Sequence, residues 1–143
     1  MNPVYRSLVI VPVAAVAAGC GTVRDLVRDF QHIQSCVTQR SGAQSINISI
    51  ATKRFTIGLV NAPMDTLPAE ARAAAARQVA ECVRDNYHRY GTLDDVAITF
   101  TKQSKIGVAK VSTTTEPLVF TTKVLGPAPA GADTAAGGAK APN

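Results

Sequence analysis

The sequence predicts one α+β domain, in which an antiparallel sheet of about five strands is covered on one face by one or two helices, in the order α-β-β-α-β-β-β. Two long stretches carry apolar residues at helical spacing, and five short stretches alternate apolar with polar residues. The short connections between sequential strands favour antiparallel pairing. A chain of 143 residues is long enough for one such domain and too short for two of ordinary size.

The first predicted helix begins at Thr22, a suitable N-cap, and ends at Ser41-Gly42, where glycine favours a stop. Between these points one stripe of the helix is apolar, with residues Val23, Leu26, Val27, Phe30, Ile33 and Val37. This stripe allows two placements, against the domain or along a membrane surface. We expect the helix to pack on the domain.

Two strands are expected next, at residues 46–50 and 55–59, because isoleucine, phenylalanine and leucine alternate there with smaller or polar residues. Residues 52–54 are few enough to form the turn of a hairpin. Residues 61–63 include a proline and end the second strand.

The second predicted helix is the clearest element, starting near residues 66–68 and ending with Gly91 as its C-cap. Its core-facing stripe is formed by Ala75, Ala76, Val79, Cys82, Val83, Asn86 and Tyr90. The opposite, solvated stripe is formed by Arg77, Glu81, Arg84 and His88, with Arg77 and Glu81 as an i,i+4 ion pair. The helix is therefore expected to pack on the sheet.

Three further strands are expected at residues 96–101, 106–111 and 118–124, with a turn around residues 102–105. Threonine recurs on the second face of these strands, as expected where one side of a sheet meets water.

The N-terminal segment has the features of an export signal. Arg6 is followed by an uncharged stretch, residues 7–19, too short for a membrane-spanning helix. It ends Val-Ala-Ala-Gly-Cys at residues 16–20, which resembles the lipobox of bacterial lipoproteins, with Ala17 in place of the commoner leucine. The resemblance implies cleavage before Cys20, acylation of that cysteine and a location in the cell envelope. It covers the signal alone and no part of the mature domain.

The domain organisation follows from this resemblance and from composition. Residues 1–19 are expected to be a signal peptide, residues 20–125 the single domain, and residues 126–143, built mainly of alanine, glycine and proline, a disordered tail. Gly21, which is not aspartate, implies delivery to the outer membrane in a Gram-negative cell, with the domain facing the periplasm or the exterior. Two alternatives are an ordinary secretory signal cut after Ala17 or Ala18, and a buried N-terminal strand.

If Cys20 carries lipid, two cysteines remain, which is an even number in an oxidising compartment. We expect Cys36 and Cys82 to form a disulfide that joins the two helices, with two separate buried thiols as the alternative. His32 and Cys36 have the i,i+4 spacing of metal ligands, and Cys82 could add a third. Such a pair arises easily by chance and His32 lies beside the apolar stripe, so no metal site is predicted.

The mature chain shows no catalytic pattern. It lacks a glycine-rich phosphate loop, a nucleophile elbow and an HExxH motif, and Asp94 and Asp95 are expected to point to opposite faces of a strand. Removal of residues 1–19 deletes Arg6 as the only charged side chain, which leaves 14 basic and 10 acidic side chains and a net charge of +4. These charges are spread along the chain, so no nucleic-acid surface is predicted.

The expected function is therefore that of a lipid-anchored envelope protein with a non-catalytic binding or structural domain and no cofactor. Its partners would be the membrane, through the anchor, and another envelope protein or glycan. A partner strand could pair with a sheet edge, or Lys102 and Lys105 could guard that edge. The alternatives are an envelope enzyme that uses Cys36 and Cys82 as thiols, and a carrier of a small ligand or metal.

Overall fold

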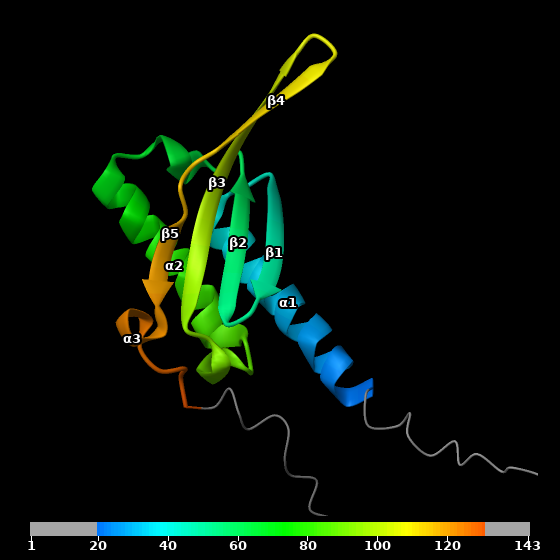
Figure 1. Ribbon diagram of the computed structural model, residues 1–143, viewed down its shortest axis with the longest axis vertical. Coiled ribbons are helices and arrows are strands. Elements are labelled where there is room, and N and C mark those ends of the chain that lie inside the picture. Colours follow the sequence, from blue (N-terminus) through cyan, green and yellow to red (C-terminus); the bar gives the residue numbers. More distant parts are fainter. Residues whose placement is uncertain (1–19, 131–143) are drawn as a thin grey trace, which may run out of the picture.

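The computed structural model describes residues 20–130, so the predicted signal peptide and the tail from residue 131 onward lie outside the described residues. It confirms an α+β fold, with helices on one side of a five-stranded, mostly antiparallel sheet (Figure 1). The elements are α1 (Cys20–Ser41), β1 (Ser45–Ala51), β2 (Arg54–Val60), α2 (Ala69–Asn86), β3 (Asp95–Ile106), β4 (Ala109–Thr114), β5 (Leu118–Thr121) and α3 (Thr122–Leu125). Two 3-10 turns, η1 (Pro63–Thr66) and η2 (Tyr90–Thr92), flank α2.

The long strand β3 organises the sheet. Its first half pairs with β2 on one side and with β5 on the other, whereas its second half pairs with β4. The β2–β3 pair is parallel, unlike the other pairs and unlike the expected antiparallel sheet. The reason is that α2 carries the chain back along the sheet between these strands, so that both enter from the same end.

The core lies between the sheet and the two long helices. The inward side chains of β2 and β3 are buried there: Phe55, Ile57, Leu59, Val96, Ile98 and Phe100. Alpha-helix α1 supplies Ile33 and Val37, and α2 supplies Ala76, Val79, Ala80 and Val83. Helix α2 packs on the sheet, as the sequence predicts, and its small buried alanines suit close packing. The expected packing of α1 on the domain is present from its middle onward.

Helix α1 ends where the sequence predicts. Gly42 has a φ of 61°, and its N–H donates to the carbonyl of Thr38 at 3.0 Å. A residue with a side chain is strained in this left-handed conformation, which explains glycine at this C-cap.

Helix α2 ends earlier than predicted, at Asn86 and not at Gly91. Tyr87 leaves the helix with φ −95° and ψ 109°, and its ring packs edge-on against Phe55 with 5.3 Å between ring centroids. Tyr90 is also buried, from the 3-10 turn that follows. Tertiary packing of the two tyrosines therefore overrides the helical pattern, and His88 does not lie on a helix.

The turn predicted around residues 102–105 is wrong, because β3 runs straight through them to Ile106. The chain instead reverses at Gly107, whose φ of 63° suits the first position of a two-residue hairpin turn. The final predicted strand is also too long. Strand β5 stops at Thr121, and residues 122–125 form a helical turn that buries Leu125.

Candidate functional site

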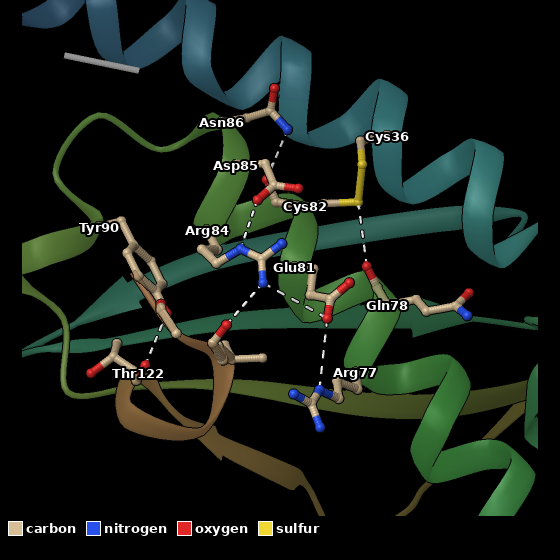
Figure 2. A network of polar contacts seen from close by, with 12 residues as sticks. Cys36, Arg77, Gln78, Glu81, Cys82, Arg84, Asp85, Asn86, Tyr90 and Thr122 are labelled. Atoms are coloured by element: carbon tan, nitrogen blue, oxygen red, sulfur yellow. Dashed lines mark hydrogen bonds and ion pairs between the residues drawn. A yellow bond between two sulfur atoms is a disulfide. The ribbon is translucent and has the colours of Figure 1, made fainter. Parts of the chain in front are cut away.

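The predicted disulfide is present between Cys36 and Cys82, and it joins the middle of α1 to α2 with a Cα–Cα distance of 5.9 Å (Figure 2). Cys82 is fully buried and Cys36 is partly buried. Burial of Cys82 hinders attack on its sulfur by an external thiol. The geometry is that of a structural bridge.

Cys20 is the first residue of α1. The half of α1 that follows it extends past the edge of the domain (Figure 1). Val23 and Val27 lie one turn apart there and are 63% and 51% exposed, and the neighbouring Arg24 and Arg28 are exposed as well. Across residues 20–130 no helix has the length and apolarity needed to cross a bilayer.

His32 lies exposed on α1, and the sulfur of Cys36 is already bonded to Cys82. The structure does not bring these three residues together as ligands. Within the part of the chain that it describes, no group of three His, Cys, Asp or Glu side chains is arranged to hold a metal ion.

Asp29 is the residue of interest that the sequence pattern missed. This α1 carboxylate is only 5% exposed, and it accepts a hydrogen bond from the backbone N–H of His88 at 2.9 Å. The same oxygen also contacts Nδ1 of the His88 ring. The pair ties α1 to the loop after α2. The contact is therefore a tether that is built on a buried carboxylate.

A second polar network holds the C-terminal turn against α2 (Figure 2). Arg77 donates to the carbonyl of Val124 at 3.2 Å, and Arg84 donates to that of Leu125 at 2.8 Å. Glu81 lies between the two guanidinium groups, 3.7 and 3.8 Å from them, and so forms the predicted pair with Arg77. These donors satisfy carbonyls that the short α3 leaves without helical partners.

A cavity of about 530 Å³ lies between the loop after α2 and the C-terminal segment. Its lining includes Tyr87, His88, Tyr90, Lys123, Pro127 and Ala128. Burial raises the pKa of both tyrosines above the ordinary value of 10.0. The Tyr90 hydroxyl already donates to the carbonyl of Gly126 at 3.1 Å. Lys123, His88 and Tyr87 are among the polar side chains of the lining that a ligand could meet.

The two adjacent aspartates do not act together. Asp95 receives two hydrogen bonds from the Arg54 guanidinium, at 2.6 and 2.9 Å, whereas Asp94 lies exposed before the strand begins. The hydrogen bonds and charge of Asp95 raise the pKa of Arg54. This pair fastens the start of β2 to the start of β3.

The most exposed part of the sheet is a ribbon, residues 102–114, which we call the arm. It is formed by the end of β3 and by β4, and it projects beyond the rest of the domain (Figure 1). Every residue of the arm is exposed, including the apolar Ile106, Val108 and Val111. Strand β1 is one lateral edge of the sheet, and the other is formed by β4 along the arm and by β5 along the first half of β3.

Comparisons with models of protein families, with curated proteins and with solved structures find no match to this chain. The class of protein that the fold and its surface define is a small disulfide-bonded α+β domain with a protruding arm.

Proposed function

We propose that this protein is a bacterial lipoprotein, held to a membrane by fatty acyl chains on Cys20, and that its domain is a non-catalytic binding module of the cell envelope. Residues 1–19 act as its signal peptide and are removed. In a Gram-negative cell, Gly21 favours the outer membrane, with the domain facing the periplasm or the exterior.

The observation that carries this proposal is the disulfide between Cys36 and Cys82. It links α1, the helix that begins at Cys20, to α2. Disulfides persist in oxidising compartments and are rare in the cytosol, so Cys36–Cys82 supports export. The lipobox-like residues 16–20 support export on separate grounds, since a signal sequence and a pair of bonded cysteines are unrelated features.

Helix α1 would act as a short, stiff spacer between the bilayer and the domain. The helix from Cys20 to the bridged Cys36 is roughly 24 Å long at 1.5 Å per residue. The exposed Val23 and Val27 would lie close to the acyl chains, with Arg24 and Arg28 placed to meet anionic headgroups. A single acyl chain binds a membrane only marginally, whereas two or three acyl chains on Cys20 make release from the membrane slow.

The charged clusters of the domain favour a binding role over a catalytic one, because their partners are parts of the fold itself. Asp29 binds the His88 loop, Arg84 binds the carbonyl of Leu125, and Arg54 binds Asp95. The surfaces that remain available to a partner are the arm and the edges of the sheet.

The alternatives have less support. A thiol-based enzyme needs an accessible sulfur, whereas Cys82 is fully buried. A small-ligand carrier is supported by the cavity of about 530 Å³ with Lys123 and His88 in its lining. Native mass spectrometry of protein purified from its own cells tests the carrier function, since a co-purifying small molecule would favour it.

The test of the proposed function is metabolic labelling with an alkyne analogue of palmitate, followed by fractionation and intact mass measurement. The wild-type chain should incorporate label, begin at residue 20 and sediment with membranes. Cys20→Ser should lose label and membrane association. The matched control, Cys36→Ser with Cys82→Ser, removes two cysteines but keeps Cys20, so it should still be labelled.

Two results would contradict the anchor. An unlabelled mature chain that starts at Ala18 or Gly19 would indicate ordinary secretion. A cytosolic chain that retains Met1 and three free thiols would exclude both export and acylation.

A further inference from the structure

The arm, residues 102–114, lacks a neighbouring strand on either side. Strand β2 ends at Val60, which pairs with Thr101, and β4 is the last strand on the other side. A two-stranded ribbon alone in water is marginally stable, because it buries little apolar surface. A third strand added to the arm would therefore gain both hydrogen bonds and apolar contact.

The arm has a net positive charge. It carries Lys102, Lys105 and Lys110 and no acidic residue. Lys105 and Lys110 are direct cross-strand partners, and like charges in that arrangement are unfavourable. A negatively charged group beside them would remove this repulsion.

Lys105 and Lys110 form a non-hydrogen-bonded cross-strand pair, as the direction of the backbone groups shows. Thr101 and Gln103 both direct backbone groups toward Asn61, on the side of β3 away from β4. Because such groups alternate along a strand, those of Lys105 also point away from β4. Its pair with Lys110 is thus a non-hydrogen-bonded one, in which side chains lie closest.

The same alternation defines the outer edge of β4. The backbone groups of Lys110, Ser112 and Thr114 point outward, away from β3. No strand of the described chain covers them. The edge of β3 is shorter, because the Asn61 side chain already accepts the N–H of Gln103 at 2.8 Å. Strand β4 is therefore the longer open edge of the arm.

The two faces of the arm differ. On the face that continues the outer side of the sheet, β4 presents Lys110 beside Lys105. On the face that continues the helix-covered side, it presents Ala109 and Val111 near Ile106, which is 69% exposed. Lys102 also lies on this second face, opposite Thr113, at the base of the arm. Near the tip of the arm, a strand added to β4 would therefore meet lysine on one face and aliphatic side chains on the other.

We propose that the outer edge of β4 binds an extended acidic segment of a partner polypeptide, which adds to the arm as a further strand. Its acidic residues lie beside Lys110 and Lys105, and its alternate aliphatic residues lie beside Val111 and Ile106. This rests on the proposed binding role, for which it names the partner's chemistry, and not on acylation of Cys20.

A polypeptide accounts for more of these features than a lipid surface does. Anionic lipid would use the lysines and the apolar tip but would leave the backbone edge of β4 unpaired. The arm also lies at the end of the molecule opposite the start of α1, where the proposed anchor is (Figure 1). It therefore points away from the membrane that would hold Cys20.

The test uses the full chain with its Cys36–Cys82 bridge intact and Cys20→Ser, so that membrane binding through acyl chains plays no part. The probe is a blocked hexapeptide of alternating Glu and Val. The controls are the same peptide with Lys for Glu, its N-methylated form, and vesicles with about a third anionic lipid. Binding is measured by titration, and its place by amide hydrogen exchange.

We expect the Glu-Val peptide to bind and to slow exchange at Lys110, Ser112 and Thr114, while the Lys-Val and N-methylated peptides do not bind. Lys105→Glu with Lys110→Glu should weaken binding roughly tenfold or more, whereas Lys53→Glu, outside the arm, should not. Ser112→Pro removes an outward N–H that β3 does not use and should weaken binding roughly tenfold, unlike Ser112→Ala.

Several outcomes would overturn the proposal: no binding of the Glu-Val peptide, equal binding of the Lys-Val peptide, or protection at β1 in place of β4. Vesicle binding that needs the lysines but is unchanged by Ser112→Pro would assign the arm to lipid. An unaltered near-ultraviolet circular dichroism spectrum shows that each variant is folded. Labelling at Cys20 is measured separately, so failure here leaves the anchor proposal standing.

Discussion

Loss of the Cys36–Cys82 bridge should lower the stability of the domain by about 4 kcal/mol. The cysteines are 46 residues apart, so the bridge closes a loop of about 47 residues in the unfolded chain. In the chain-entropy model this loop removes about 13.6 cal/mol/K from the unfolded state, which is about 4 kcal/mol at 25 °C. The perturbation is Cys36→Ala with Cys82→Ala, which leaves no buried thiol or hydroxyl.

The fold itself should survive this change. Ile33 and Val37 still bury α1 against the core, and Asp29 still holds the His88 loop. Since domains of this size have about 5–15 kcal/mol of stability, a folded but weakened protein is expected. Its melting temperature should fall by about 15 °C or more.

The assay is urea unfolding followed by far-ultraviolet circular dichroism, since the chain contains no tryptophan. All proteins carry Cys20→Ser, and the comparison is between the oxidised parent, the same protein with reductant, and the double alanine variant. The reduced parent and the variant should agree closely. A change in unfolding free energy below about 1 kcal/mol would refute the loop-entropy argument, and loss of all helical signal would refute the claim that α1 packs without the bridge.

Three other perturbations test the remaining contacts. Asp29→Ala should cost about 1–3 kcal/mol in urea unfolding, because it leaves the partly buried N–H of His88 without its acceptor. Leu125→Ala should cost about 2–5 kcal/mol, because the side chain is only 3% exposed. Burial raises the pKa of Tyr87 and Tyr90. The stability that this burial contributes is therefore full below a pH of about 10 and is lost as the pH rises further. The melting temperature, measured as a function of pH, tests this expectation.

Each of these has a control. Asp25→Ala removes only an exposed pair with Arg28 and should change stability by less than about 0.5 kcal/mol; an equal effect at Asp29 would contradict a buried tether. Val124→Ala, at an exposed neighbour, is the control for Leu125. A double Phe variant of Tyr87 and Tyr90 should flatten the alkaline decline, and an unchanged decline would assign it to other groups.

Local pattern was sufficient for the elements whose two faces differ in polarity. Alternation located β1 and β2, and the stripe of α1 together with Gly42 gave both the helix and its end. These patterns predict structure well because a helix or strand that buries one face repeats its apolar residues with a fixed period, which a few residues are enough to show.

The errors lie where a distant residue decides the conformation. Tyr87 leaves α2 to pack on Phe55, although the helical stripe continues in the sequence. Residues 102–105 looked like a turn because two lysines interrupt the apolar alternation, yet the arm is exposed on both faces and needs no such alternation. Asp29 lies outside the apolar stripe of α1, and nothing in the local sequence indicates that it contacts the His88 loop.

Sequence alone determined the α+β class and the approximate order of helices and strands, because hydrophobic period is a local property. It favoured the Cys36–Cys82 bridge but left two separate buried thiols as the alternative. Tertiary structure alone decided the parallel β2–β3 pair, the Asp29 tether and the projection of the arm. These depend on which surfaces meet after the chain has crossed back over the sheet, and contacts between residues far apart in the chain leave no periodic trace in either segment.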